Sequence, residues 1–182
     1  MVVFDSAFLL LVLDKRAKAP SDPTTGEPVA KATERVEYLI KTLSADKEKI
    51  IIPTPVLSEV LVHAGSATEK YLEVLNNQAT FRIAPFDQKA AIEAAVAMRD
   101  ALHRGGHRID AANPDATKTK IKFDRQIVAI AKAEGAHTIY SDDEDVFNYG
   151  QRAGLKVIRT SELDLPPEDP QMKMDLPSPA DR

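Results

Sequence analysis

The sequence has 182 residues and contains neither cysteine nor tryptophan. The lack of cysteine excludes a disulfide framework, a zinc site with thiolate ligands and a thiol nucleophile. Any chemistry must therefore come from carboxylates, histidines or hydroxyls. Long apolar runs are also lacking: the stretch 7–13 is too short to cross a bilayer, and no basic segment precedes it as in a signal peptide. We expect a cytoplasmic protein that does not contact a membrane.

The net charge of −4 at first argues against a nucleic-acid partner. However, residues 162–182 hold six acids and two bases, so this segment alone accounts for 2 − 6 = −4, and residues 1–161 are balanced. The same segment carries five of the twelve prolines and little apolar surface to bury. We therefore expect one domain over residues 1–161 and a Pro-rich acidic tail over 162–182, either poorly ordered or docked on a partner.

Short apolar stretches alternate with helical segments along the domain. Continuous rather than alternating hydrophobicity is typical of strands buried on both faces. The expected strands are 2–4, 49–52, 79–84, 137–140 and 156–158, and the expected helices are a short one from Ala7 and then 30–43, 54–63, 68–76, 88–102 and 123–134. This alternation predicts an α/β fold, a three-layer α/β/α sandwich with a four- to five-stranded parallel, Rossmann-like sheet.

Several acids stand where packing alone would favour other residues. Asp5 ends the first strand, Glu59 lies in an apolar helix turn, and Asp124 leads the apolar stripe of the last expected helix. Asp143 and Asp145 follow the fourth strand. Each alone has a structural explanation: a helix cap for Asp5 and Asp124, a surface position for Glu59, and a solvated turn for the last pair.

Together these acids point to a metal site. Parallel strands place their carboxyl ends at one edge of the sheet, so acids from three separate elements are expected to converge there. Converging carboxylates repel one another unless a cation lies between them. Oxygen ligands without cysteine favour a hard ion such as Mg²⁺ or Mn²⁺, and the natural substrate of such a site is a phosphodiester.

Four segments, in order, resemble the PIN domain, a small metal-dependent ribonuclease fold that includes the toxins of VapBC-type toxin–antitoxin pairs. They are Val3-Phe4-Asp5-Ser6, the stretch 53–60, the stretch 123–131 and the stretch 139–146. The resemblance implies metal bound by Asp5, Glu59, Asp124 and Asp143. Its last motif singles out Ser141, Asp143 and Asp145 rather than Asp142, and we expect Asp145 to be a further metal ligand. The resemblance also implies an RNA substrate, an antitoxin partner and a homodimer.

The resulting hypothesis is an endoribonuclease that uses Mg²⁺ or Mn²⁺ to activate water. Glu59 acts as a ligand directly or through water, and Ser6 and Ser141 hold the carboxylates as hydrogen-bond donors or are plain turn residues. The connection 103–122 is basic and is expected to follow a nucleic-acid backbone; the contact residues predicted there and just beyond it are Lys118, Lys120, Lys122 and Arg125.

Two alternatives remain at this point. A catalytically inactive PIN-like adaptor that binds nucleic acid or protein has the same fold, although all four acids are present. An aspartate-phosphorylated α/β protein fits less well. A haloacid-dehalogenase-type phosphatase needs an acid at the position of Ala7, and a receiver needs a phosphoacceptor Asp after the third strand, where Ala84-Pro85 stands.

Overall fold

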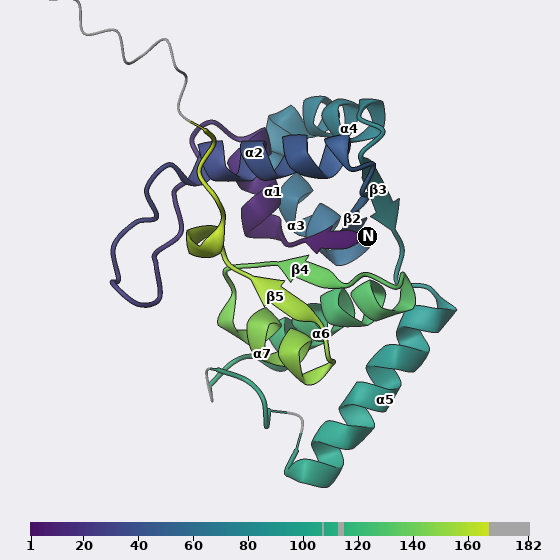
Figure 1. Ribbon diagram of the computed structural model, residues 1–182. Coiled ribbons are helices and arrows are strands. Elements are labelled where there is room, and N and C mark those ends of the chain that lie inside the picture. The colour runs from purple at the N-terminus through teal and green to yellow at the C-terminus, as the bar shows by residue number, and fades with distance from the viewer. Residues whose placement is uncertain (107, 113–114, 168–182) are drawn as a thin grey trace, which may run out of the picture.

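A computed structural model describes residues 1–106, 108–112 and 115–167. Its centre is a single sheet of five strands, all parallel, in the order β3-β2-β1-β4-β5 (Figure 1). The strands are β1 (Val2–Phe4), β2 (Ile50–Pro53), β3 (Phe81–Ala84), β4 (Thr138–Tyr140) and β5 (Lys156–Ile158). The predicted α/β class and parallel sheet are confirmed.

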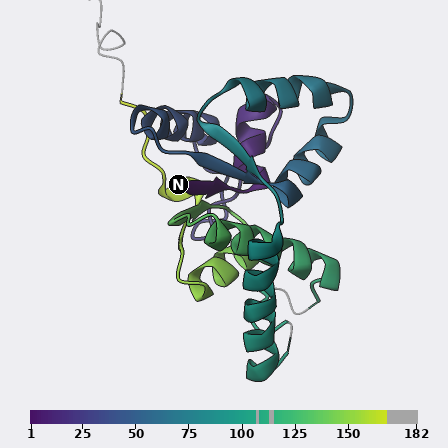
Figure 2. The same cartoon turned by 90° about the vertical axis from the view of Figure 1, so that its right-hand side faces the viewer.

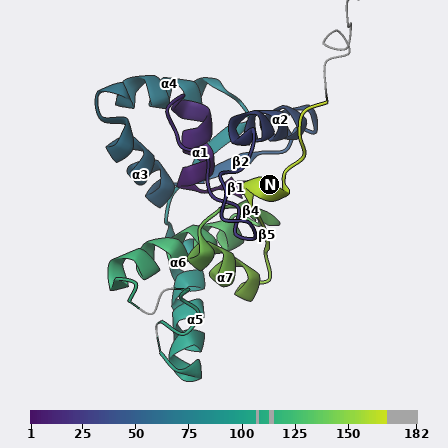
Figure 3. The same cartoon turned by 90° about the vertical axis from the view of Figure 1, so that its left-hand side faces the viewer.

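Helices cover both faces of the sheet. The helices before β3 are α1 (Ser6–Leu13), α2 (Ala32–Ala45), α3 (Thr54–Ala64) and α4 (Thr68–Asn77), and those after it are α5 (Gln88–Arg104), α6 (Lys118–Ala133) and α7 (Glu144–Arg152). The first four lie on one side and α6 and α7 on the other, while α5 projects away from the body, as Figures 2 and 3 show. Short 3₁₀ turns, η1 (Gly65–Ala67) and η2 (Thr160–Glu162), complete the described elements.

The core lies around the three central strands. All residues of β1, β2 and β4 are buried, as continuous hydrophobicity predicts for strands covered on both faces. Val3 in β1 pairs with Ile51 on one side and Ile139 on the other. The chain order reverses next to β1, because β2 and β3 extend the sheet one way and β4 and β5 the other. Such a reversal leaves a crevice at the carboxyl ends of the strands.

Two helices differ from the expectation. Helix α6 begins at Lys118 rather than 123, because Thr117 caps it: the Thr117 hydroxyl accepts a hydrogen bond from Lys120 N at 3.1 Å. Helix α7 was not predicted at all. Asp143 caps it by accepting hydrogen bonds from the backbone N–H groups of Asp145 and Val146. Part of the expected basic loop is therefore helix, and the expected acidic turn is a helix N-terminus.

The packed fold extends slightly past the expected boundary at residue 161. Leu163 is buried in the core, and its carbonyl accepts a hydrogen bond from Arg35 of α2. The rest of the predicted tail, from residue 168 on, lies outside the described residues. None of the helices in the described part of the chain combines the length and the hydrophobicity needed to cross a membrane.

Candidate metal centre

The predicted site acids meet at the carboxyl edge of the sheet. Asp5, Glu59, Asp124 and Asp143 all line one open cleft of about 520 Å³. They come from four elements: the end of β1, helix α3, helix α6 and the N-terminus of α7. The convergence predicted from the order of strands and helices is thus present in the structure.

Asp5 is held at the end of β1 by three interactions. Its backbone N–H donates to the carbonyl of Tyr140, which joins the end of β1 to the end of β4. Its Oδ2 accepts a 2.5 Å hydrogen bond from the Ser141 hydroxyl, and its Oδ1 accepts a 2.7 Å bond from Ser6 N. Burial raises the pKa of Asp5 to about 6, although both hydrogen bonds oppose the shift. The two hydrogen bonds therefore fix the direction of the carboxyl group, and its pKa lies about one unit below neutral pH.

The two serines serve Asp5 differently. The Ser141 hydroxyl is fully buried and also accepts a hydrogen bond from Asp143 N at 3.1 Å. It therefore connects two predicted metal ligands. Ser6 acts mainly through its backbone N–H, because its hydroxyl lies 3.5 Å from Asp5 Oδ1.

Three further carboxylates form the densest part of the site. One oxygen from each of Asp124, Asp143 and Asp145 lies within 4.8 Å of the other two. Asp124 points into the cleft from the second turn of α6, and burial raises its pKa to about 6. Since it lies beyond the first helical turn, capping and the helix dipole do not explain its position. Asp145 is buried, and its Oδ1 accepts a 2.6 Å hydrogen bond from Ala112 N.

Lys120 lies in the middle of this cluster. Its Nζ is 2.8 Å from Asp124 Oδ2, 3.1 Å from Asp143 Oδ2 and 2.6 Å from Asp145 Oδ2. Burial lowers the pKa of Lys120, but the hydrogen bonds to the three carboxylates outweigh burial, and the net pKa is raised. The prediction that Lys120 reaches a nucleic-acid backbone does not fit this placement, because its ammonium faces the acids.

Glu59 lies at the cleft and is exposed to solvent. The sequence left open a carboxylate of the metal site and a plain surface position, and the exposed position agrees with the second while the cleft contact keeps the first open. Its helix α3 is amphipathic here: Val56 and Val60 pack into the core and Glu59 faces the cleft. An exposed carboxylate at the rim is free to act through a water molecule.

Asp142 also lines the cleft, but both of its carboxylate oxygens accept hydrogen bonds from Thr160. Its Oδ1 accepts from Thr160 N at 2.9 Å, and its Oδ2 accepts from the Thr160 hydroxyl at 2.6 Å. These bonds fasten the turn after β4 to the segment after β5. Thr160 is fully buried and supports the site turn, but no motif in the sequence indicates this function.

Arg125 corrects another expectation. It is 6% exposed, and its guanidinium lies 4.8 Å from the centre of the Tyr149 ring on α7. A buried, stacked Arg cannot follow a nucleic-acid backbone. Lys118 and Lys122 are exposed on α6 and remain available for that function.

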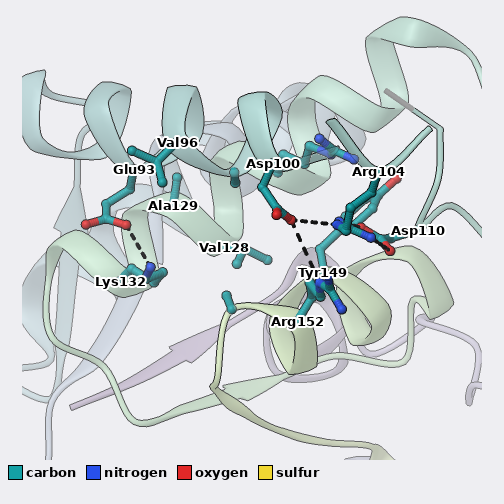
Figure 4. Close-up of a pocket in the computed structure, with 13 residues that line it drawn as sticks. Glu93, Val96, Asp100, Arg104, Asp110, Val128, Ala129, Lys132, Tyr149 and Arg152 are labelled. Carbon is teal, nitrogen blue, oxygen red and sulfur yellow. Dashed lines mark hydrogen bonds and ion pairs between the residues drawn. The ribbon is translucent and has the colours of Figure 1, made fainter. Parts of the chain in front are cut away.

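Arg125 also lines a second, smaller cavity of about 190 Å³ between α5, α6 and α7 (Figure 4). Val96 and Val128 form part of its apolar wall. Charged side chains around it pair with each other, as Glu93 does with Lys132 at 2.8 Å. It shares no lining residue with the acidic cleft.

The acidic cleft fits a divalent metal ion by the chemistry of its donors. Its lining offers carboxylate oxygens from Asp5, Asp124 and Asp143 and from the exposed Glu59, and an oxygen of Asp145 lies within 4.8 Å of oxygens of Asp124 and Asp143. Hard ions such as Mg²⁺ and Mn²⁺ prefer such oxygen ligands. The gathering of three carboxylates around one ammonium shows that this geometry suits a central cation.

Comparisons with known proteins establish the fold. No family model matches the sequence, and no curated protein matches it. One chain of the VapBC2 structure from Rickettsia felis, bound to a promoter DNA fragment, aligns with 15% identity and a TM-score of 0.56, over 87% of this chain and 98% of that chain. A chain of DNA-bound VapBC from Salmonella typhimurium aligns with 14% identity and a TM-score of 0.55, over 87% and 97%.

A chain of the FitAB structure bound to a DNA fragment aligns with 18% identity and a TM-score of 0.54, over 90% of this chain and 98% of that chain. The predicted PIN-like fold is confirmed. The alignments cover 87–90% of this chain, so the PIN-like fold accounts for most of the protein. At these identities the likeness concerns the fold, and the chemistry of the site rests on its own geometry.

Proposed function

We propose that this protein is a Mg²⁺- or Mn²⁺-dependent endoribonuclease and the toxin of a VapBC-type toxin–antitoxin pair. The observation that carries the proposal is the meeting of Asp5, Glu59, Asp124 and Asp143 in one open cleft of a PIN-like fold. The structural neighbours are themselves VapBC and FitAB complexes bound to DNA fragments, which supports an antitoxin partner here.

In this proposal Asp5, Asp124 and Asp143 hold the metal ion, with Asp145 beside them. A bound divalent ion would lower the pKa of a water molecule and neutralise charge on the phosphate. In this proposal Glu59 orients that water, and its exposed position in the lining of the cleft supports this role. Ser141 fixes the direction of the Asp5 carboxylate, so the ligand does not need to be reorganised when substrate arrives.

RNA is the proposed substrate on the basis of the family resemblance. The cleft is open to solvent, so a long polymer can enter it from the surface of the protein. Lys118 and Lys122 are the proposed backbone contacts, because both are exposed on the helix that carries Asp124. The homodimer and the cytoplasmic location that we expect from the sequence belong to the same proposal. Light scattering on the purified chain tests the homodimer.

The decisive experiment is cleavage of single-stranded RNA by the purified full chain. We expect cleavage with Mn²⁺ or Mg²⁺, none after chelation, and a loss of about 100-fold or more in Asp5→Asn or Asp124→Asn, which each lose a ligand charge at the metal. Glu37→Gln is a matched control, because Glu37 is an exposed acid on α2, away from the cleft. Its cleavage rate should equal that of the parent.

The inactive adaptor makes the opposite prediction. Under that alternative the parent leaves RNA intact at every metal concentration, yet binds it or a protein partner. Intact RNA with Mn²⁺ and Mg²⁺ would therefore overturn the proposed enzyme and favour the adaptor.

A further inference from the structure

One positive charge of the chain already lies among the proposed metal ligands. Lys120 Nζ is 2.8 Å from Asp124, 3.1 Å from Asp143 and 2.6 Å from Asp145. An ammonium group has three N–H donors, and here each can meet a different carboxylate. These are the same three residues whose oxygens lie within 4.8 Å of one another.

We propose that Lys120 is an internal counter-ion that competes with the divalent metal for these carboxylates and leaves the cluster when the metal binds. This inference rests on the proposed metal-dependent function. An ammonium and a divalent cation repel each other strongly at such short range, and both need the same carboxylate oxygens. The two occupancies are therefore mutually exclusive.

The surroundings identify Lys120 as the partner that moves. Asp145 is fixed by its bond from Ala112 N, and Asp143 is fixed as the cap of α7. The side chain of Asp124 is 11% exposed, whereas that of Lys120 is 43% exposed. A lysine side chain is flexible along four carbons, so its head can leave toward solvent while the helix stays in place.

Competition of this kind has two consequences. In the metal-free protein, Lys120 offsets the repulsion among these three carboxylates in place of a metal ion. On binding, the metal must displace the ammonium, so its affinity is lower than the carboxylates alone would give. Lys120 thereby sets the metal concentration at which the site fills.

Calorimetric titration of the chelator-treated full chain with MnCl₂ tests the proposal. Lys120→Met keeps most of the side chain and removes the charge; we expect Mn²⁺ to bind about tenfold more tightly, which corresponds to about 1.4 kcal/mol. Lys120→Arg keeps the charge and should stay near the parent. Lys122→Met removes the same charge from the same helix, but no ion pair involves Lys122 among the described residues, so its Mn²⁺ affinity should also match the parent.

A second measurement uses the unmodified protein. Labelling by an amine-reactive reagent, followed by mass spectrometry, should modify Lys120 faster with Mg²⁺ than without it, while Lys122 reacts equally in both conditions. Equal or weaker Mn²⁺ binding by Lys120→Met, or no change in Lys120 labelling when Mg²⁺ is bound, would overturn the competition while the metal site stands. Absence of Mn²⁺ binding in every variant would overturn the proposed function as well.

Discussion

Replacing Ser141 by Ala removes the hydroxyl that connects two proposed metal ligands. This hydroxyl donates to Asp5 Oδ2 at 2.5 Å and accepts from Asp143 N at 3.1 Å. Because the pKa of Asp5 is about 6, its carboxylate is ionised at pH 7.5. A hydrogen bond to a charged group contributes about 1.5–3 kcal/mol, so we take about 2 kcal/mol as the loss in free energy of unfolding.

This loss converts into a measurable shift in melting temperature. For a domain of this size each kcal/mol lowers Tm by about 2–4 °C, so Ser141→Ala should melt about 4–8 °C below the parent in metal-free buffer at pH 7.5. Metal affinity should fall by about 10- to 100-fold, since the bond that orients Asp5 is lost. Circular dichroism on heating and calorimetric titration with MnCl₂ measure the two effects.

Ser6→Ala is the matched control for this experiment. Its hydroxyl lies 3.5 Å from Asp5 Oδ1, and the strong bond comes from the Ser6 backbone N–H, which alanine retains. We expect a change within about 0.5 kcal/mol. If Ser141→Ala and Ser6→Ala show the same Tm and the same Mn²⁺ affinity, the argument that the buried hydroxyl orients Asp5 is refuted.

Three further predictions concern pH, packing and the role of Asp142. Burial raises the pKa of both Asp5 and Asp124 to about 6, so protons compete with metal; titrations at pH 5 and 7.5 should show Mn²⁺ affinity at least about tenfold weaker at pH 5. In the metal-free chain these groups hold protons more strongly when folded, so their contribution to stability should decrease from about pH 4 to about pH 6, and this decrease should be missing in a variant that lacks both acids. Gly150→Ala would place a Cβ 2.6 Å from Val157 Cγ2. Thermal unfolding should show a loss of about 1–3 kcal/mol in the free energy of unfolding. An unchanged stability would argue against close packing of α7 on β5. Asp142→Ala should also lose about 1–3 kcal/mol yet keep its Mn²⁺ affinity within about threefold of the parent, and a greater loss of affinity would make it a ligand instead.

The central strands and the meeting point of the acids follow from sequence for clear physical reasons. Continuous apolar runs such as Val2-Val3-Phe4 and Ile50-Ile51-Ile52 need cover on both faces, which parallel strands between helices provide. Parallel strands also fix which end of each strand shares an edge. Asp5 and Asp143 could therefore be placed together without knowledge of the order of the strands.

Side-chain direction on the helices was less predictable. Glu59 stands among apolar residues in the sequence, but Val56 and Val60 form the buried face of α3 and Glu59 lies on its exposed face. Arg125 lies in a basic stretch, yet it is buried against Tyr149, a residue far along the chain. Burial of a charged residue by a distant element leaves no local signal in the sequence.

Lys120 shows how the boundary of one helix changes the interpretation of a site. With the helix begun at 123, Lys120 belongs to a solvated basic loop, and a phosphate contact is its natural function. With the helix begun at Lys118, Lys120 and Asp124 are four residues apart on one face and are expected to pair. The capping residue Thr117 was the available sequence signal for the earlier start. The sequence could not show that Asp143 and Asp145 contact the same ammonium, because this depends on α7 packing against α6. Through this tertiary contact Lys120, which would otherwise form a surface ion pair with Asp124, becomes the counter-ion of the proposed metal site.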